Sequence, residues 1–395
     1  MTPRTRAAGA LSRPALGPVD PVLGAIVTAL IGFGIVMVYS ASAVEATVQM
    51  HDPHYYLKRQ AIFGVGALVT MWAVSAFDYH RLRKLTYWNL AFVVLTLVVC
   101  ISGLGHSGGG ARRWISLGPI HVQPAEMAKL ALVMWLAYSL EKKAERVTTF
   151  LVGFLPHVIV PGVLMLLCLK QPDFGSAVVL AFLSFTLMFV AGARIGYLAI
   201  GTFLAGGGAV ALVVTQAYRL RRYLAWLDMD KHRQDMAYQP FQSVMSFGSG
   251  GALGLGLGRG LQVLYLPEAH TDFIAAIVGE ELGFLGVLGL CAAYLVIVAR
   301  GVRIAVLAPD DYGSYLSFGI STMFGVQALV NLAVAMAIAP AKGLTLPFMS
   351  YGGSSLLVNA VAAGILLNIS RQGTKMVPVE ASSERSSLAP EQSPA

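Results

Sequence analysis

Long runs of apolar residues, separated by short polar segments, dominate the pattern along the chain. A helix needs roughly 20 apolar residues to cross the hydrocarbon core of a bilayer, and ten runs approach that length. They are continuous and lack the short alternations of a membrane β-barrel, so a helical bundle is the expected spanning structure. The ten expected helices cover residues 21–41, 61–77, 85–104, 125–140, 149–169, 175–192, 195–217, 272–299, 313–339 and 354–371. We therefore predict an all-α membrane protein of about ten transmembrane helices.

The basic residues of the short loops predict the orientation in the membrane. They gather on one side of the predicted bundle, which the positive-inside rule makes cytoplasmic, together with both termini. These residues are Arg4, Arg6, Arg13, Arg81, Arg83, Lys84, Lys142, Lys143, Arg146, Arg194, Arg300, Arg303, Arg371 and Lys375. The predicted organisation is a cytoplasmic tail over 1–19, a membrane domain over 20–371 and a disordered cytoplasmic tail over 372–395. Within the membrane domain, 218–271 forms one large extracytoplasmic loop.

Composition agrees with this interpretation and excludes others. The chain is 56% hydrophobic and only 12% charged, which is far from the usage of soluble domains. Its net charge of +8 falls largely in short loops, where it sets orientation and does not indicate nucleic-acid binding. The three cysteines lie inside apolar runs without metal-ligand or disulfide spacing, and the first residues show no removable signal peptide.

Asp272 is the first candidate for chemistry, because it lies where a polar loop passes into the eighth predicted helix. Thr271 or Asp272 is suited to cap that helix, since short polar side chains accept hydrogen bonds from free N–H groups at a helix start. A carboxylate at the membrane border also suits a general base, provided that a substrate binds beside it. The residue pattern alone is compatible with both roles.

Cationic side chains are expected at the same depth. Arg112 follows a run of glycines in the loop before the fourth helix, and Lys129 lies three residues after Glu126, so that this pair shares a helix face. The pair either neutralises itself or serves function, as ionisable residues within spans commonly do. The glycine-rich segment 248–260 contains Arg259; it suits either a close backbone approach to a phosphate or a flexible re-entrant turn.

The segment 340–355 is an irregular turn with two prolines and several glycines. Ser354 or Ser355 is suited to cap the helix that follows. Irregular backbone at membrane depth is tolerated where it lines a cavity, so we expect a cavity wall here, opposite Asp272. In the eighth helix, Glu280 and Glu281 are expected to be buried structural groups.

Several motifs together resemble the SEDS family. They are Leu266-Pro-Glu-Ala-His-Thr-Asp272-Phe, Gly279-Glu-Glu-Leu-Gly283, Pro340-Ala-Lys-Gly-Leu-Thr-Leu-Pro-Phe-Met-Ser-Tyr-Gly-Gly-Ser-Ser355, Tyr39-Ser-Ala-Ser42, Arg113-Trp-Ile115, Gln123-Pro-Ala-Glu-Met-Ala-Lys129 and Gln171-Pro-Asp-Phe-Gly175. The resemblance runs from about residue 20 to residue 371, and the last turn is more similar to the cell-division branch than to the elongation branch. Family members usually carry a lysine after the glutamine that matches Gln262, whereas this chain has Val263.

The resemblance implies a peptidoglycan glycosyltransferase of the bacterial cytoplasmic (inner) membrane, acting at the division septum with its active site facing outward. Such an enzyme joins lipid II to a growing glycan strand, and its implied partners are a class B penicillin-binding protein, other divisome proteins and membrane lipid. Asp272 is then the general base for the acceptor hydroxyl, with undecaprenyl pyrophosphate as the leaving group.

The same resemblance suggests substrate-binding residues, because a departing pyrophosphate needs nearby positive charge. A divalent cation, Mg or Mn, is compatible with that task, although the pattern identifies no metal ligands and no other cofactor. The expected substrate-binding residues are Arg112, Glu126, Lys129, Arg259, Lys342, Ser350 and Ser354.

Two other functions fit a many-helix bundle. One is a lipid II flippase, which is a transporter; the concentration of ionisable residues on one side and the lack of an evident inverted repeat weigh against it. The other is a non-catalytic scaffold for division proteins, which does not exclude enzymatic activity.

Overall fold

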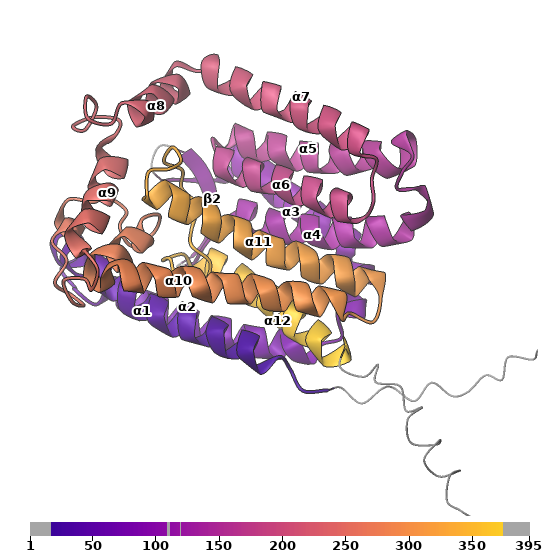
Figure 1. Ribbon diagram of the computed structural model, residues 1–395, viewed down its shortest axis with the longest axis horizontal. Helices are drawn as coiled ribbons and strands as arrows, with labels where there is room; N and C mark the ends of the chain where they lie inside the picture. The colour runs from indigo at the N-terminus through magenta and orange to yellow at the C-terminus, as the bar shows by residue number, and fades with distance from the viewer. Residues whose placement is uncertain (1–16, 109–110, 119, 374–395) are drawn as a thin grey trace, which may run out of the picture.

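The computed structural model describes residues 17–108, 111–118 and 120–373. The two tails expected at 1–19 and 372–395 lie almost wholly outside these residues. In the described part, ten long helices match the ten expected apolar runs, and the protein is an all-α multi-pass membrane protein (Figure 1). These helices are α1 (Pro21–Met50), α2 (Tyr55–Ala76), α3 (Leu82–Val99), α4 (Pro124–Lys142), α5 (Leu155–Lys170), α6 (Phe174–Val190), α7 (Ile195–Val214), α10 (Ile274–Val306), α11 (Asp311–Ala335) and α12 (Gly353–Gly373).

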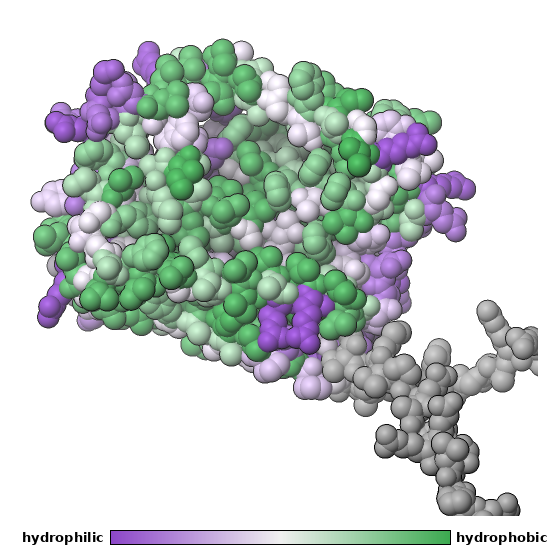
Figure 2. Space-filling view, viewed as in Figure 1, coloured by the Kyte–Doolittle hydropathy of each residue, from purple (hydrophilic) through white to green (hydrophobic). Residues whose placement is uncertain are grey.

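Length and apolar composition suit eight of these segments for crossing a membrane, and α6 is a shorter apolar helix. In the space-filling view, hydrophobic side chains cover the middle of the molecule, and hydrophilic side chains gather mainly toward its two ends, with one further hydrophilic patch near the lower edge (Figure 2). This pattern is the one that a bilayer requires, because apolar side chains face lipid while polar ones reach water at either surface.

The helices differ greatly in burial. α4 lies in the centre of the bundle, where it packs against α3, α6 and α11, and most of its residues are buried. By contrast, α7 runs along one edge of the bundle beyond α6, and Leu198 is its only buried residue (Figure 1). One side of α7 is therefore available to lipid along most of its length.

Smaller elements lie at the end of the bundle opposite residues 17 and 373, and we call this end the site end (Figure 1). Two of them lie in the expected loop 218–271: α8 (Ala217–Leu227), which begins one residue before it, and α9 (Tyr238–Gly250). The expectation of helices alone missed a three-stranded antiparallel sheet in the segment before α4. Its strands are β1 (His106–Gly108), β2 (Ala111–Leu117) and β3 (Ile120–Val122), in the order β1-β2-β3.

Short single turns complete the connections between the long helices. They are the 3-10 turns η1 (Tyr79–Arg81), η3 (Ala144–Arg146) and η5 (Gln262–Leu264), and the wider turns η2 (Cys100–Leu104) and η4 (Phe150–Phe154). At the end opposite the site end, the Gly17 N–H donates to the carbonyl of Arg371 at 2.9 Å, so the first and last described segments lie side by side.

Candidate active site

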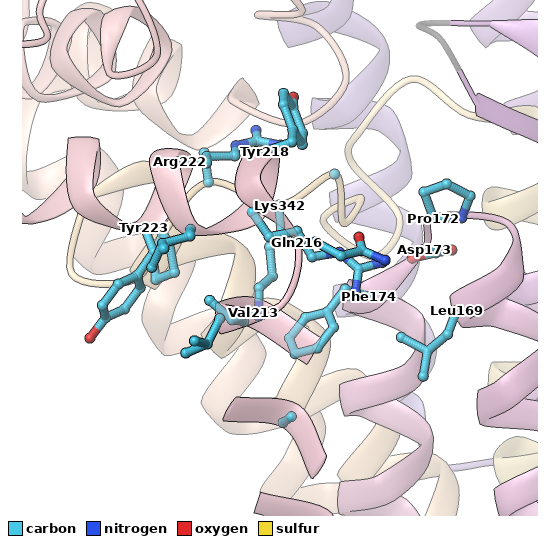
Figure 3. Close-up of a pocket in the computed structure, with 18 of the residues that line it drawn as sticks. Leu169, Pro172, Asp173, Phe174, Val213, Gln216, Tyr218, Arg222, Tyr223 and Lys342 are labelled. Carbon is cyan, nitrogen blue, oxygen red and sulfur yellow. The ribbon is translucent and has the colours of Figure 1, made fainter. Parts of the chain in front are cut away.

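A cavity of about 1090 Å³ opens at the site end of the bundle (Figure 3). Five parts of the chain build it: strand β2, the turn between α5 and α6, the segment from α7 into α8, the loop that ends at Asp272 ahead of α10, and the turn after α11. Its lining residues are Arg113, Leu169, Lys170, Pro172, Asp173, Phe174, Gly175, Ala209, Val210, Val213, Val214, Gln216, Tyr218, Arg219, Leu220, Arg222, Tyr223, Asp272, Pro340, Ala341, Lys342 and Gly343. The cavity thus has an apolar side formed by α7, and charged side chains from the other segments line the rest.

Asp272 lines this cavity, and its backbone is fixed on both sides. The Asp272 N–H donates to the carbonyl of Glu268 (3.1 Å), and the Asp272 carbonyl accepts a hydrogen bond from the Asn331 side chain of α11 (2.9 Å). The turn after α11 approaches closely, because a Cβ at Gly343 would lie 3.0 Å from Asp272 Oδ2. The carboxylate is therefore held at a defined place beside that turn.

The expected capping role of Asp272 or Thr271 is wrong. The residue that precedes the first turn of α10 is Phe273, and no side chain caps the free N–H groups there. The Thr271 hydroxyl instead donates to the carbonyl and the carboxylate of Glu268. The Asp272 carboxylate is thus left for the cavity, which removes the structural explanation for an acidic residue at this position.

The environment of Asp272 raises its pKa to about 7, mainly because the side chain is withdrawn from water and secondarily because Glu268 is near. Arg113 and Arg222 act in the opposite direction. The helix start was expected to favour the ionised carboxylate and burial to oppose it; burial is the stronger effect. A group with a pKa near neutrality is well suited to accept a proton at physiological pH.

Five cationic side chains line the cavity with Asp272: Arg113, Lys170, Arg219, Arg222 and Lys342. Within the described residues, none of the five forms an ion pair with a carboxylate. One buried nitrogen of Arg219, Nη1, has no hydrogen-bond partner. Charges left without an internal partner are available to an anionic ligand.

Two of these cations are held in place by neighbouring groups. Arg113 donates from Nε to the carbonyl of Gln171 (3.1 Å) and from Nη2 to that of Pro172 (2.6 Å). Lys342 Nζ lies 4.3 Å from the centre of the Phe174 ring, a cation–π contact. Burial, with a smaller contribution from Arg222, lowers the pKa of Lys342. Both side chains are thus oriented before any ligand arrives.

Asp173 is the second carboxylate of the cavity, but it is occupied. Its oxygens accept from the Ser176 N–H (3.0 Å) and the Ser176 hydroxyl (2.7 Å), which caps the start of α6. Among the described residues, no group of three or more His, Cys, Asp and Glu side chains is arranged to hold a metal ion. A divalent cation here would need oxygen ligands from a bound phosphate, as Mg²⁺ commonly does.

Of the expected substrate-binding residues, one lines the cavity and the others do not or cannot be placed there. Lys342 lines the cavity with Asp272, as expected. Arg259 is exposed in the glycine-rich loop and does not line the cavity. Arg112 lies in β2, and its side chain is outside the described part of the structure. For Arg259 and Arg112, contact with substrate stays a prediction from the sequence.

Glu126 and Lys129 form a buried polar cluster in the helix core, outside the cavity lining. Lys129 Nζ donates to Glu126 Oε1 (2.7 Å) and to Gln327 Oε1 of α11 (2.6 Å), and the Ser355 hydroxyl of α12 donates to Glu126 Oε2 (3.1 Å). The exposed fractions of the two charged side chains are 3% and 1%. The alternative of mutual neutralisation therefore describes this pair in the structure, and substrate contact stays a prediction.

The serines of the last turn hold the turn together. The Ser350 hydroxyl accepts from the Leu346 N–H (2.8 Å), and the Ser354 hydroxyl accepts from the Gln123 N–H at the start of α4 (3.3 Å). Neither lines the cavity. Ser355 bonds Thr345 and Glu126. In this structure these serines bind the turn to itself and to the start of α4, and their contact with substrate stays a prediction.

Some residues of the cavity were not singled out from the sequence. Arg219 and Arg222 lie three residues apart in α8, so they share one helix face and point toward the cavity. The signal was their spacing within a segment of marked amphipathic character. Lys170 is the last residue of α5, and Asp173 caps the start of α6. The sequence placed the link between these two helices on the outer side of the membrane, but it gave neither residue a role.

The chain is similar to known proteins over most of its length. Residues 22–375 match the family described as cell cycle proteins FtsW, RodA and SpoVE. A relative named probable peptidoglycan glycosyltransferase FtsW, from Trichlorobacter lovleyi, is 46% identical over 379 residues, which cover 92% of this chain and 96% of the relative.

Solved structures share the fold. A chain from a peptidoglycan synthase complex that coordinates polymerization and crosslinking is 30% identical, with a TM-score of 0.73, and the match covers 90% of this chain and 99% of that one. The rod shape determining protein RodA of Thermus thermophilus is 29% identical, with a TM-score of 0.65, over 90% of this chain and 98% of RodA.

Proposed function

The chain belongs to the FtsW, RodA and SpoVE family of cell cycle proteins, and on that premise we propose that it polymerises lipid II into glycan strands with Asp272 as general base. One observation carries the role of Asp272. Its carboxylate caps no helix and has a pKa raised to about 7. It faces a cavity lined by cations that form no ion pair with any carboxylate in the described part of the chain. A base and the positive charge for an anionic leaving group thus lie in one cavity.

In the proposed reaction, Asp272 accepts the proton of the acceptor sugar hydroxyl. The resulting oxygen attacks the anomeric carbon of the growing strand, and the bond from that carbon to the pyrophosphate oxygen breaks. Undecaprenyl pyrophosphate leaves with the bonding electrons, and the configuration at the carbon inverts. The base and the leaving group must therefore lie on opposite sides of the reacting carbon.

The cavity cations supply what the leaving group needs. Negative charge grows on the pyrophosphate as the bond breaks, and positive groups fixed in place before the reaction stabilise that charge most strongly. Arg113 and Lys342 are fixed in this way by backbone carbonyls and by Phe174. The apolar side chains of α7, Val210 and Val213 among them, suit the lipid portion of the substrate.

We infer the location and the partners from the family. The relative named FtsW supports the cell-division branch, and so a place in the cytoplasmic membrane at the septum. The peptidoglycan synthase complex supports a class B penicillin-binding protein as the crosslinking partner. By the positive-inside rule, the cavity faces outward, where lipid II is consumed.

A polymerase accounts for the structure better than a flippase does. The unpaired charges gather in a cavity at one end of the bundle, while the ionisable residues deeper in the core, Glu126 and Lys129, are paired and buried. A transporter of a charged headgroup would need polar groups that are free along the whole path.

The deciding experiment measures glycan strands made from lipid II by the purified chain, with any partner transpeptidase blocked. We expect polymer from the wild type, and for Asp272→Ala a loss of about a hundredfold or more, as for removal of a general base. Glu268→Gln is the matched control, because it removes a neighbouring carboxylate and keeps Asp272. An active Asp272→Ala protein would reject the base; movement of labelled lipid II across vesicles without polymer would favour the flippase.

A further inference from the structure

Helix α10 is interrupted at Gly283, one turn beyond Glu280, and a second segment of the chain fills the interruption. Gly283 has φ 67° and ψ −164°, a backbone conformation that favours glycine. Residues 250–256, which we call the wedge, lie against this break. A Cβ at Gly283 would overlap the backbone of the wedge at Ala252 and Gly254.

The wedge takes over the hydrogen bonds that the helix gives up. In an uninterrupted helix, the N–H groups of residues 284 and 285 would donate to the carbonyls of residues 280 and 281. Here all four groups bond to the wedge. The bonds run from Phe284 N–H to the Gly251 carbonyl (2.9 Å), from Leu285 N–H to the Ala252 carbonyl (3.2 Å), from Leu255 N–H to the Glu280 carbonyl (3.0 Å) and from Gly256 N–H to the Glu281 carbonyl (2.9 Å).

Glycine permits this close approach. Gly254 has φ +80°, and a Cβ there would overlap the carbonyl oxygen of Glu281. Gly250 likewise lies against the carbonyl of Gly279, where a Cβ has no room. By contrast, a Cβ at Gly258, which also has positive φ, would meet nothing within 4 Å. The wedge therefore depends on particular glycines and not on flexibility of the whole glycine-rich loop.

Side chains of the same helix segment hold the chain after the wedge. Glu280 Oε1 accepts from the N–H groups of Leu261 (2.7 Å) and Gln262 (3.0 Å), and Glu281 Oε1 accepts from the Ser40 hydroxyl of α1 (2.5 Å). Both glutamates are buried. The two glutamates are thus buried structural groups, as the sequence predicts, and each accepts hydrogen bonds from another segment of the chain.

These contacts lead directly to Asp272. From Gln262 the chain makes η5, and the Leu266 N–H donates back to the Gln262 carbonyl (2.8 Å). Asp272 then precedes residues 274–282, the short part of α10 on its side of the break. Both the loop that enters Asp272 and the helix that leaves it are therefore fixed by Glu280 and the wedge.

We propose that the wedge and Glu280 are positioning elements that aim the Asp272 carboxylate into the cavity. This inference rests on the proposed function, because it assigns a purpose to the base described above. The break in α10 allows the axis of residues 274–282 to differ from that of the rest of the helix. The wedge stabilises this arrangement, because it forms the hydrogen bonds that the backbone groups at the break would otherwise lack. Withdrawal of the wedge would allow α10 to form its own hydrogen bonds and turn Asp272 away.

The test compares substitutions in the full chain by polymerisation kinetics and by hydrogen exchange. Glu280→Ala removes the acceptor for two N–H groups, and we expect kcat to fall on the order of a hundredfold, as for a misplaced catalytic group, with KM for lipid II unchanged. Glu280→Gln keeps an oxygen that accepts both hydrogen bonds, so we expect a kcat within a few-fold of wild type.

Substitutions at Gly254 and Gly258 distinguish a role of the wedge from a role of the whole glycine-rich loop. Gly254→Ala is expected to lower kcat as Glu280→Ala does, whereas Gly258→Ala, which is the same change at another positive φ, is expected to keep most of the activity. In hydrogen exchange, amides of residues 262–273 should exchange faster in Glu280→Ala and Gly254→Ala, and at the wild-type rate in Gly258→Ala.

Three results would overturn the inference: wild-type kcat in Glu280→Ala, equal losses in the alanine and glutamine variants, or lost activity with unchanged exchange at 262–273. If Gly254→Ala fails to fold, the Glu280 pair decides alone. Failure of the proposed function is seen separately, as activity that survives Asp272→Ala. Hydrogen exchange would then still show whether the wedge holds this segment.

Discussion

The cavity around Asp272 and the buried cluster of Glu126 and Lys129 contain the same kinds of side chain in opposite settings. In the cluster, Lys129 is almost fully buried, and each of its two hydrogen bonds ends on a side-chain oxygen. In the cavity, Lys342 is half-buried and rests on an aromatic ring, and no described carboxylate pairs with it. A buried charge with an internal partner is neutralised within the fold, whereas one without such a partner is available to a ligand.

The difference also explains why helix position alone does not identify function. α4 passes through the centre of the bundle, so any charged group on it must be neutralised by its neighbours. The turn after α11 borders a cavity in which Lys342 is only half-buried. The cost of leaving a charge unpaired is therefore lower in the cavity than in the core.

The largest effect is expected from a substitution that breaks the buried ion pair of Glu126 and Lys129. Lys129→Met leaves Glu126 buried without its partner, and we expect a loss of about 3–5 kcal/mol in the free energy of unfolding. Thermal unfolding in detergent measures this. The double substitution Glu126→Gln with Lys129→Met should recover most of the loss, because no uncompensated charge remains. A stable Lys129→Met protein that has lost only activity would place Lys129 with the cavity residues.

The corresponding change in the cavity should affect activity and leave stability intact. We expect Arg222→Gln to lower the polymerisation rate roughly tenfold, since it removes one of the cavity cations that we propose stabilise the leaving group. Unfolding temperature should stay at the wild-type value. Arg221→Gln is the matched control: it changes the neighbouring arginine of α8, which is exposed and does not line the cavity. Equal losses in both variants would count against a role for the cavity cations.

The pH dependence of polymerisation should report Asp272 itself. Because its pKa is raised to about 7 and only the ionised carboxylate accepts a proton, the rate should rise tenfold per pH unit below about pH 7 and level off above it. Initial rates in buffers of constant ionic strength test this. A rate that is flat between pH 5 and about pH 8 would contradict the assignment.

The smallest expected effect refines that profile. Glu268 contributes to the raised pKa of Asp272, so Glu268→Gln should lower this pKa and move the midpoint of the profile to lower pH. The plateau rate should change little, because Asp272 is retained. A midpoint that moves upward would show that Glu268 acts on Asp272 by another route than charge repulsion.

Asp272 and the wedge show which features a local sequence pattern can predict. The sequence places Asp272 at the start of a predicted helix but leaves both capping and catalysis open, because both roles use an acidic residue at a helix start. The structure assigns the start of α10 to Phe273 without any side-chain cap. The interruption at Gly283 could not be seen in the sequence either, because the predicted helix continues through it. The backbone angles of Gly283 and the hydrogen bonds to residues 251–256 reveal it.

The sequence by itself determined the class of protein, the ten helices and the family, because hydrophobic length and short motifs are properties of neighbouring residues. Tertiary structure alone decided which charges are free. Arg113, Arg222 and Lys342 come from distant segments and meet at one cavity with Asp272. Lys129, in an equally suggestive motif, is neutralised by Glu126 and donates a further hydrogen bond to Gln327 of α11. The availability of a charge depends on what surrounds it in space, and for these residues much of that surrounding comes from other helices.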